Sequence, residues 1–381
     1  MWLPTSANGE SSGGGGAAGL GLVQRRLHLD ATLLGMLLLL STVGLVVLYS
    51  AFGESLVQVE RQLIRLAIAF AVMVVLAQFP PLVYRRWAPW VYAASLALLV
   101  AVLVAGELGG GARRWLDLGV VRFQPSEFMK IALPLLVAWL LADRELPPGF
   151  GRTMLALLLI ALPVGLIAVQ PDLGTSILVA AAGGSVLFLA GLRWRIMAGL
   201  LALLAAAAPM LWYFGMQGYQ RQRVLTFLDP ERDPLGAGYN IIQSKIAIGS
   251  GGLYGKGWLN GTQAHLDFIP ERHTDFVFAV LAEEFGFIGV LLVLALYFAV
   301  VARGLWIAHH AQDSFGRLLA GGLALTFFVY FFVNIGMVSG LLPVVGLPLP
   351  LISFGGSSLV TLLAAFGILM SIHTHRRLWS S

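Results

Sequence analysis

The sequence contains no cysteine and few charged residues. The absence of cysteine among 381 residues excludes a disulfide framework and any metal site built on thiolates. Charged residues make up only 11% of the chain, whereas a soluble domain averages about 25%. This scarcity excludes an ordinary soluble domain, and the 58% of apolar residues predicts a polytopic membrane protein instead.

Motifs for nucleotides and for zinc are also missing. The glycines match neither Walker nor Rossmann spacing, and no HExxH sequence occurs. His265 and His273 are not at metal-ligand spacing, although carboxylates could hold a hard cation together with a phosphate. No nucleic-acid partner and no organic cofactor are expected.

The N-terminal segment differs from the rest of the chain. Residues 1–24 include the Gly13–Gly16 run, and their composition predicts a disordered cytoplasmic tail. A signal peptide is not expected, because the apolar run after Arg25 and Arg26 has full membrane length and no small-residue cleavage pattern. Residues 25–381 are predicted to form one membrane domain.

Ten apolar segments are candidates for membrane spans, since a span needs roughly 20 mostly apolar residues. The fold class expected is therefore all-α, with ten transmembrane helices. Paired basic residues recur in alternate connections, which predicts an even number of spans with both termini cytoplasmic. A large outer loop, about residues 215–274, precedes the eighth helix. The ten segments are about 31–51, 60–79, 87–106, 126–142, 152–169, 174–190, 195–214, 275–302, 317–338 and 355–373.

Basic residues also occur in the two long outer loops, against the alternation. Each one alone is most simply a solvated charge, but as a set they indicate an outward-facing site for an anion such as phosphate or pyrophosphate. They include Arg113, Arg114 and Arg122 in the loop 107–125, and Lys245, Lys256 and Arg272 in the loop 215–274.

Two QP motifs place charges near the outer ends of spans. In QPSEFMK, Glu127 and Lys130 are three residues apart and share a helix face, so a local pair is one interpretation. In QPDLGTS, Asp172 lies in a tight outer turn at similar depth. We therefore also expect that Lys130 pairs with Asp172 across the bundle, either as a structural clamp or as part of a site.

The segment PERHTDF leads from the large loop into the eighth helix. Asp275 is expected at the mouth of that helix, at the boundary between water and lipid. An alternative is that Thr274 or Asp275 only caps the helix. Further along, Glu283 and Glu284 are consecutive, so their side chains point about 100° apart and are not expected to share a partner.

A stretch rich in glycine, serine and proline, residues 338–360, separates the last two spans. Irregular backbone at membrane depth must be buried in protein or line a cavity. Ser353 and Ser357 could bind a ligand there, or could satisfy broken helix ends.

Together these motifs resemble a known family. GTQAHLDFIPERHTDFVFAVLAEEFG, QPSEFMKIAL, QPDLGTS, QSKIAIGSGGLYGKG and PLPLISFGGSS look like the signatures of the SEDS proteins (shape, elongation, division and sporulation), in the same order. The GTQ sequence is more similar to the rod-shape type, RodA, than to the division type, FtsW. The resemblance covers nearly the whole chain beyond the N-terminal tail.

The resemblance implies a ten-helix peptidoglycan glycosyltransferase. Such an enzyme polymerises lipid II into glycan strands on the outer (periplasmic) face of the cytoplasmic, or inner, membrane, for cell elongation and rod shape. The resemblance also implies that Asp275 is the essential aspartate. It further implies that Lys130 and Asp172 are the functional residues of the QP motifs and that Arg113 or Arg114 is the functional arginine. Implied partners are a class B penicillin-binding protein, a transpeptidase, with polyprenyl diphosphate-linked glycan as substrate and other elongation-complex membrane proteins nearby.

The chemistry that the resemblance implies, and with which these residues agree, is an inverting transfer. One carboxylate, Asp275, takes the proton of the acceptor hydroxyl, and cations stabilise the pyrophosphate leaving group. A divalent cation, Mg or Mn, could assist, and the residues that would hold it are not identified. The residues expected to bind substrate are Arg113, Arg114, Lys130, Asp172, Lys245, Lys256, Gln263, Glu271, His273, Thr274, Ser353 and Ser357.

Two other functions fit an intramembrane site. A lipid II flippase would also use membrane charges and broken helices, and a non-enzymatic scaffold could recruit the transpeptidase. A transporter should carry charges at the midplane and show internal repeats, whereas these ionisable groups cluster toward the outer ends of spans. The enzyme is therefore the favoured interpretation.

Overall fold

The computed structural model describes residues 27–375, apart from 110–111, 118–121, 144, 217, 231–237 and 267. The predicted disordered tail, residues 1–24, lies outside the described residues. Within the described part, each of the ten predicted apolar segments coincides with a helix. These helices are α2 (Ala31–Ala51), α3 (Leu56–Ala77), α4 (Pro81–Ala105), α5 (Pro125–Ala142), α6 (Phe150–Val169), α7 (Leu173–Leu189), α8 (Trp194–Met210), α12 (Val277–His309), α13 (Ser314–Val338) and α14 (Ser357–Thr374).

Seven of the described helices are long and apolar enough to cross a membrane: α2, α4, α5, α6, α12, α13 and α14. Helices α7 and α8 are apolar but have only 17 residues each, and α3 carries Glu60, Arg61 and Arg65. The prediction of a mostly helical, multi-pass membrane protein is confirmed.

The connections contain short elements that hydropathy alone did not predict. An antiparallel sheet of three strands follows α4, with β1 (Glu107–Gly109), β2 (Ala112–Asp117) and β3 (Arg122–Phe123) in that order. The all-α prediction missed it because strands of two to six residues are too short for a clear alternating pattern. Helix α8 continues into η1 (Leu211–Gly215), and the large loop then forms α9 (Gly218–Leu228), α10 (Tyr239–Ser250) and α11 (Thr262–His265).

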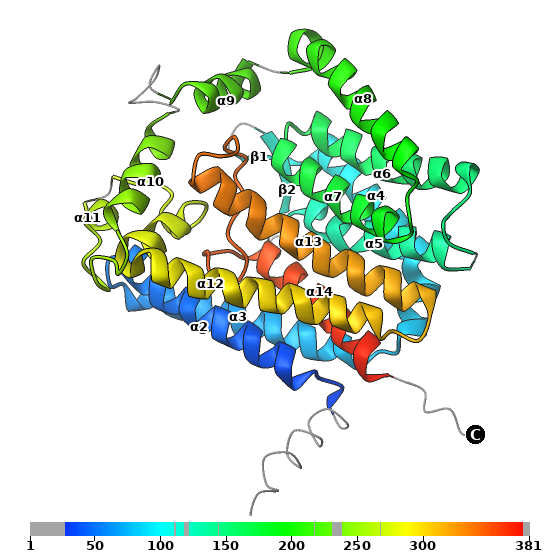
Figure 1. Ribbon diagram of the computed structural model, residues 1–381, viewed down its shortest axis with the longest axis horizontal. Helices are drawn as coiled ribbons and strands as arrows, with labels where there is room; N and C mark the ends of the chain where they lie inside the picture. Colours follow the sequence, from blue (N-terminus) through cyan, green and yellow to red (C-terminus); the bar gives the residue numbers. More distant parts are fainter. Residues whose placement is uncertain are drawn as a thin grey trace, which may run out of the picture.

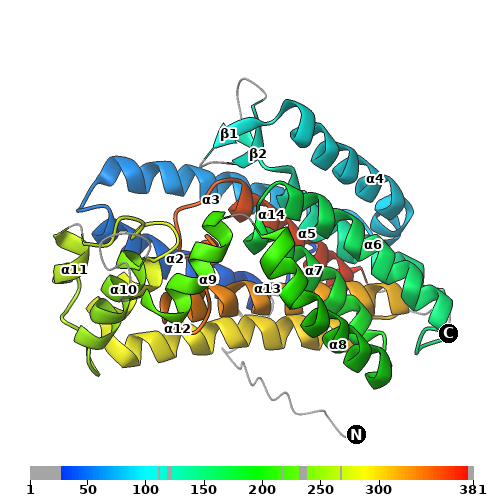
Figure 2. The same ribbon diagram turned by 90° about the horizontal axis from the view of Figure 1, so that it is seen from above.

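The long helices pack as a bundle in which neighbours in space are often distant in sequence. Helix α12 lies along α2 and α13, α14 packs on α3, and α4 packs on α5 (Figure 1). The view from above shows α4 on one side of the bundle and α12 on the other (Figure 2). Helix α7 packs against α5, α6 and α13, so these four helices form one packed group within the bundle.

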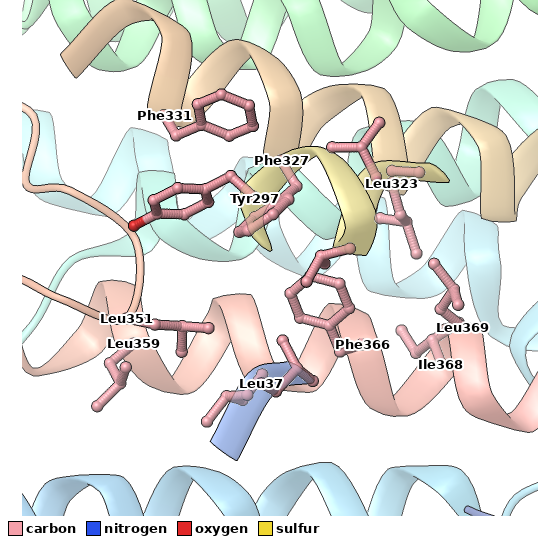
Figure 3. Packing of buried hydrophobic residues seen from close by; sticks show 14 of the residues in the cluster. Leu37, Tyr297, Leu323, Phe327, Phe331, Leu351, Leu359, Phe366, Ile368 and Leu369 are labelled. Atoms are coloured by element: carbon pink, nitrogen blue, oxygen red, sulfur yellow. The ribbon is translucent and has the colours of Figure 1, made fainter. Parts of the chain in front are cut away.

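Aromatic side chains fill the centre of the bundle where α12, α13 and α14 meet. Tyr297 stacks on Phe331 with ring centroids 4.7 Å apart, and Phe327 packs edge-on against Phe366 at 5.1 Å (Figure 3). The Tyr297 hydroxyl donates to the carbonyl of Pro350 at 2.5 Å. This bond attaches the proline-rich segment 339–356 to the core, and residues 347–353 of the segment are mostly buried.

Helix α12 is interrupted at Gly286, which has φ of +64° and ψ of −166°. The segment 251–257 packs onto this break, and the N–H groups of Lys256 and Gly257 donate to the carbonyls of Glu283 and Glu284 at 3.0 Å. A Cβ at Gly255 or Gly286 would collide with the backbone of the other segment. The eighth apolar segment is therefore two helical pieces rather than the single helix predicted over 275–302.

The two ends of the described chain meet at one end of the bundle. The rings of His28 and His375 stack with centroids 4.0 Å apart. Asp30, which is 1% exposed, caps α2 through the Leu33 N–H, and its carboxylate lies 2.6 Å from Arg303 and 2.8 Å from His373. We call this the terminal end. The ends of α2, α12 and α14 thus meet here.

Replacing Asp30 by Asn should destabilise the protein at neutral pH. Burial alone would raise the pKa of Asp30, but His373 and Arg303 hold this pKa well below its usual value. A carboxyl group with a depressed pKa stabilises the fold above its unfolded pKa of about 3.9, and this contribution is lost as pH falls further. Breaking a buried pair costs about 3–5 kcal/mol.

We therefore expect Asp30→Asn to lower the thermal midpoint in detergent at pH 7, by an amount that stays nearly constant down to about pH 4 and shrinks as pH falls further. The matched control is Asp313→Asn, an exposed residue that caps α13. Equal midpoints for Asp30→Asn and the wild type at pH 7 would contradict the stabilising role of this cluster.

Candidate functional site

The backbone of Asp275 is fixed from inside the bundle. Asn334 of α13 is fully buried, and its amide Nδ2 donates to the carbonyls of Asp275 at 2.9 Å and Leu347 at 2.5 Å. One amide group thus joins the turn before α12 to the proline-rich segment, and the Asp275 side chain remains half-buried.

Two further bonds connect the same two segments, and a third orients Ser353 within its own segment. The Ser353 hydroxyl donates to the Thr274 carbonyl at 2.5 Å and accepts from the Leu349 N–H at 2.7 Å. The Phe354 N–H donates to the His273 carbonyl at 2.8 Å. The N-cap of α12 is Phe276, without a side-chain cap bond, and the Thr274 hydroxyl bonds Glu271 instead, so Thr274 does not cap this helix.

Within the turn, two predicted site residues bond each other. The Thr274 hydroxyl donates to the carboxylate of Glu271 at 2.6 Å. His273 packs between the rings of Phe52 and Phe354, at centroid distances of 5.4 and 6.3 Å. Burial lowers the pKa of His273, and Arg272 adds to this effect while Glu271 opposes it. These effects favour the neutral imidazole, which can accept a hydrogen bond.

Tyr330 of α13 is the point at which charged groups from several helices converge. The Lys130 ammonium lies 4.5 Å from the centre of the Tyr330 ring. The Tyr330 hydroxyl bonds with Ser358 and interacts electrostatically with Glu127, Asp172 and Asp275. Ionisable residues from α5, the start of α7 and the turn before α12 thus lie within electrostatic range of one phenol.

Lys130 pairs with Glu127 at 2.7 Å, and both side chains are buried. The other oxygen of Glu127 accepts from the Thr361 hydroxyl of α14 at 3.2 Å. The local pair is therefore correct, and the predicted pairing of Lys130 with Asp172 across the bundle is wrong. The reason is sequence separation: Glu127 is one turn away on the same helix, whereas Asp172 is occupied by other donors.

Asp172 caps α7 and faces the first long loop. Its carboxylate accepts from the Thr175 N–H and from the Gln124 amide, both at 3.2 Å. Arg114 of β2 lies 3.8 Å from the same carboxylate and donates to the Pro171 carbonyl at 2.7 Å. The sheet missed by the sequence analysis is thus the element that brings an arginine to the site. The side chain of Arg113, also in β2, lies outside the described residues.

Lys256 and Gln263 belong to a different cluster, around Glu283. The Glu283 side chain is 0% exposed, and one of its oxygens lies 2.6 Å from the Lys256 ammonium and 3.1 Å from the Gln263 N–H. Glu284 instead accepts from the Ser50 hydroxyl of α2. The two glutamates have separate partners, as predicted.

Two predicted residues make weaker connections. Lys245 is exposed on α10, and Ser357 begins α14 with its carbonyl accepting from the Thr361 hydroxyl at 3.0 Å. Their roles in substrate binding stay predictions. In the part of the chain that the structure describes, no group of three or more His, Asp or Glu side chains could hold a metal ion.

The sequence analysis did not single out Tyr330 or Asn334. Both lie in the apolar stretch FFVYFFVNIGMV, four residues apart and thus on one face of α13. That spacing of a phenol and an amide inside an apolar span was the available signal.

Comparison with known protein families agrees with the motifs and the geometry described above. Residues 25–378 match the model of the cell cycle protein family FTSW_RODA_SPOVE. The chain belongs to this family. The SEDS resemblance inferred from the motifs is therefore confirmed over nearly the whole chain.

Individual relatives of the SEDS family support the same assignment. The peptidoglycan glycosyltransferase MrdB of Escherichia coli K12 is 59% identical over 355 residues, covering 93% of this chain and 96% of MrdB. A probable peptidoglycan glycosyltransferase FtsW of Trichlorobacter lovleyi is 40% identical, covering 91% and 94%. The higher identity to MrdB agrees with the predicted RodA-like type.

Solved structures resemble the fold as well. A chain of a peptidoglycan synthase complex aligns with a TM-score of 0.80 and 35% identity, covering 92% of this chain and 99% of that one. RodA of Thermus thermophilus aligns with a TM-score of 0.70 and 33% identity, covering 91% and 97%.

Replacing Lys256 by Met should release the segment 251–263 from α12. Without the ammonium, the Glu283 carboxylate would be a buried charge that has lost its cation, and breaking such a pair costs about 3–5 kcal/mol. We expect faster amide hydrogen exchange across residues 251–263 and at Glu283–Gly286, with little change in α5 or α13.

The matched control is Lys245→Met, which removes an exposed lysine from the neighbouring α10. Exchange in 251–263 that is the same in Lys256→Met, Lys245→Met and wild type would show that the Glu283 pair does not hold this segment.

Proposed function

We propose that this chain polymerises lipid II at the end of the bundle where Asp275 lies, with Asp275 as the general base. The class of enzyme is shown by the relatives described above: the chain is a peptidoglycan glycosyltransferase. The observation that supports the finer proposal is that Asp275, Lys130 and Asp172 gather around Tyr330, with Arg114 on Asp172. A carboxylate and two cations then lie within one site.

The chemistry needs both kinds of group. The donor sugar is α-linked to a polyprenyl pyrophosphate and the product linkage is β, so one inversion takes place. A carboxylate accepts the proton of the attacking hydroxyl, and cations stabilise the negative charge that develops on the departing pyrophosphate. We assign the first role to Asp275 and the second to Arg114 and Lys130, with Arg113, Lys245 and Lys256 as further candidates.

A divalent cation, Mg or Mn, could arrive with the pyrophosphate. The carboxylates of Asp275 and Asp172 are hard oxygen ligands of the kind that such ions prefer. In this proposal the ion bridges substrate and protein, because the described residues alone offer no complete cage.

We further propose ten spans in the cytoplasmic (inner) membrane, with both termini inside and Asp275 facing outside. The alternation of arginines supports this orientation, as does the position of the terminal end at the opposite end of the bundle.

A class B penicillin-binding protein is the proposed partner. Support comes from the similar chain solved within a peptidoglycan synthase complex that coordinates polymerization and crosslinking. Other elongation-complex proteins would share this membrane.

Replacing Asp275 by Asn tests the base assignment. The amide keeps the size of the side chain but cannot accept the proton, and loss of base catalysis typically costs 10²–10⁴-fold in rate. We expect purified Asp275→Asn, with a class B partner present, to form almost no glycan from lipid II in detergent, while its thermal midpoint stays near that of the wild type.

Asp313→Asn, at the terminal end, should polymerise normally and serves as the control. Near-normal glycan synthesis by Asp275→Asn would show that Asp275 is not the general base. Because detergent abolishes the two compartments, glycan formation also separates the enzyme from a flippase or a scaffold.

Asn334→Ala should slow polymerisation without removing any charged group. The change frees the carbonyls of Asp275 and Leu347, and misplacement of a catalytic group by about 1 Å can cost roughly 10²-fold. We expect a lower kcat with little change in KM for lipid II. Asn260→Ala, which alters an exposed amide of the large loop, is the control. A raised KM with an unchanged kcat would mean that Asn334 acts on substrate binding rather than on the position of Asp275.

A further inference from the structure

A hollow lined by arginine, tryptophan and aliphatic side chains lies at the terminal end, away from Asp275. It is about 500 Å³ in volume and is formed where the start of α4 meets the last turns of α5. Its lining residues are Leu82, Val83, Arg85, Arg86, Trp87 and Trp139. The Phe79 carbonyl, just before α4, accepts from Ser371 near the end of α14, which places this hollow at the terminal end.

The two arginines of the hollow differ in their partners. Arg85 forms an ion pair with Asp143, at the end of α5. Arg86 is exposed, and no ion pair to it occurs within the described residues. Arg85 is thus oriented by a carboxylate, while Arg86 presents a guanidinium whose planar fork matches the oxygens of a phosphate group.

The rest of the lining is apolar or aromatic and is turned outward. Leu82 is 57% exposed, Trp87 is 56% exposed and Trp139 is 37% exposed. Trp90 lies one helical turn beyond Arg86 on the same face of α4 and is 70% exposed. Tryptophan at the end of a spanning helix is typical of the level at which lipid headgroups meet acyl chains. Along α4, the exposed side chains that follow Arg86 are therefore the aromatic Trp87 and Trp90.

We propose that this hollow binds an anionic phospholipid of the leaflet at the terminal end, which is the cytoplasmic leaflet in the orientation proposed above. Arg86, assisted by Arg85, holds the phosphodiester, and Trp87, Trp139 and Trp90 pack against the glycerol and the acyl chains. A basic pocket between helices on the cytoplasmic side is the kind of site that anionic headgroups occupy. The ligand is a membrane phospholipid and not the polymerisation substrate, whose site lies at the other end.

The test is native mass spectrometry of the full-length protein in a neutral detergent. The probes are dioleoyl phosphatidylglycerol and dioleoyl phosphatidylcholine, which share acyl chains and differ in headgroup charge. We expect one phosphatidylglycerol to bind more tightly than phosphatidylcholine. Arg86→Gln should weaken phosphatidylglycerol binding by roughly tenfold, the scale of one charge-assisted hydrogen bond. Arg86→Lys, which keeps the charge and loses the fork, should fall between.

The matched control is Arg193→Gln. Arg193 is an exposed arginine beside the exposed Trp194 at the terminal end, and it lies outside the hollow. Equal affinity for the two lipids, or equal weakening by Arg86→Gln and Arg193→Gln, would overturn the proposal in favour of diffuse surface binding. Lipid binding is measured without lipid II, so its failure is distinguishable from failure of the polymerisation mechanism. Arg86→Gln should leave glycan synthesis in detergent unchanged.

Discussion

Irregular backbone at membrane depth requires protein groups to bind its N–H and C=O groups, and the site depends on how this is achieved. The turn before α12 and the segment 339–356 are both irregular, and each satisfies the other. Ser353 and Asn334 bind carbonyls of the turn, while Tyr297 binds the Pro350 carbonyl from the core. These bonds go to the main-chain carbonyls of Asp275 and Thr274, so they fix the backbone that carries the carboxylate of the proposed mechanism.

The break at Gly286 applies the same constraint to α12. The interrupted ladder exposes carbonyls of Glu283 and Glu284, and the N–H groups of the segment 251–257 bind them. The buried Glu283 side chain then requires a cation, which Lys256 of that segment supplies. Part of the large loop is thereby attached to the helix that begins at Asp275. A change in this loop would be transmitted to the site through the backbone of α12.

Hydropathy located the ten long helices because apolar runs of membrane length carry a strong, local signal. The partners of the charges were harder to predict, since spacing cannot tell which of two carboxylates at similar depth lies nearer to Lys130. Glu127 binds it because both belong to one helix, while Asp172 is occupied by α7 and Arg114. The break at Gly286 and the sheet carrying Arg114 depend on packing between distant segments, which no single stretch of sequence reveals. The role of Asn334 could not be predicted from the sequence, because it depends on the carbonyls of Asp275 and Leu347, which only the folded structure brings beside it.

The pairing of charges bears on how an anionic substrate could enter. Each cation near Tyr330 already has a carboxylate close by: Glu127 for Lys130 and Asp172 for Arg114. Such pairing lowers the cost of holding charge at membrane depth in the absence of substrate. A pyrophosphate must then share these cations with the two carboxylates, and the excess negative charge has to be compensated. An additional cation carried by the substrate would compensate it, which gives an electrostatic reason for a divalent ion even though the described side chains form no cage of their own. In the proposed mechanism, the Asp275 carboxylate would then accept the proton that the acceptor hydroxyl must lose.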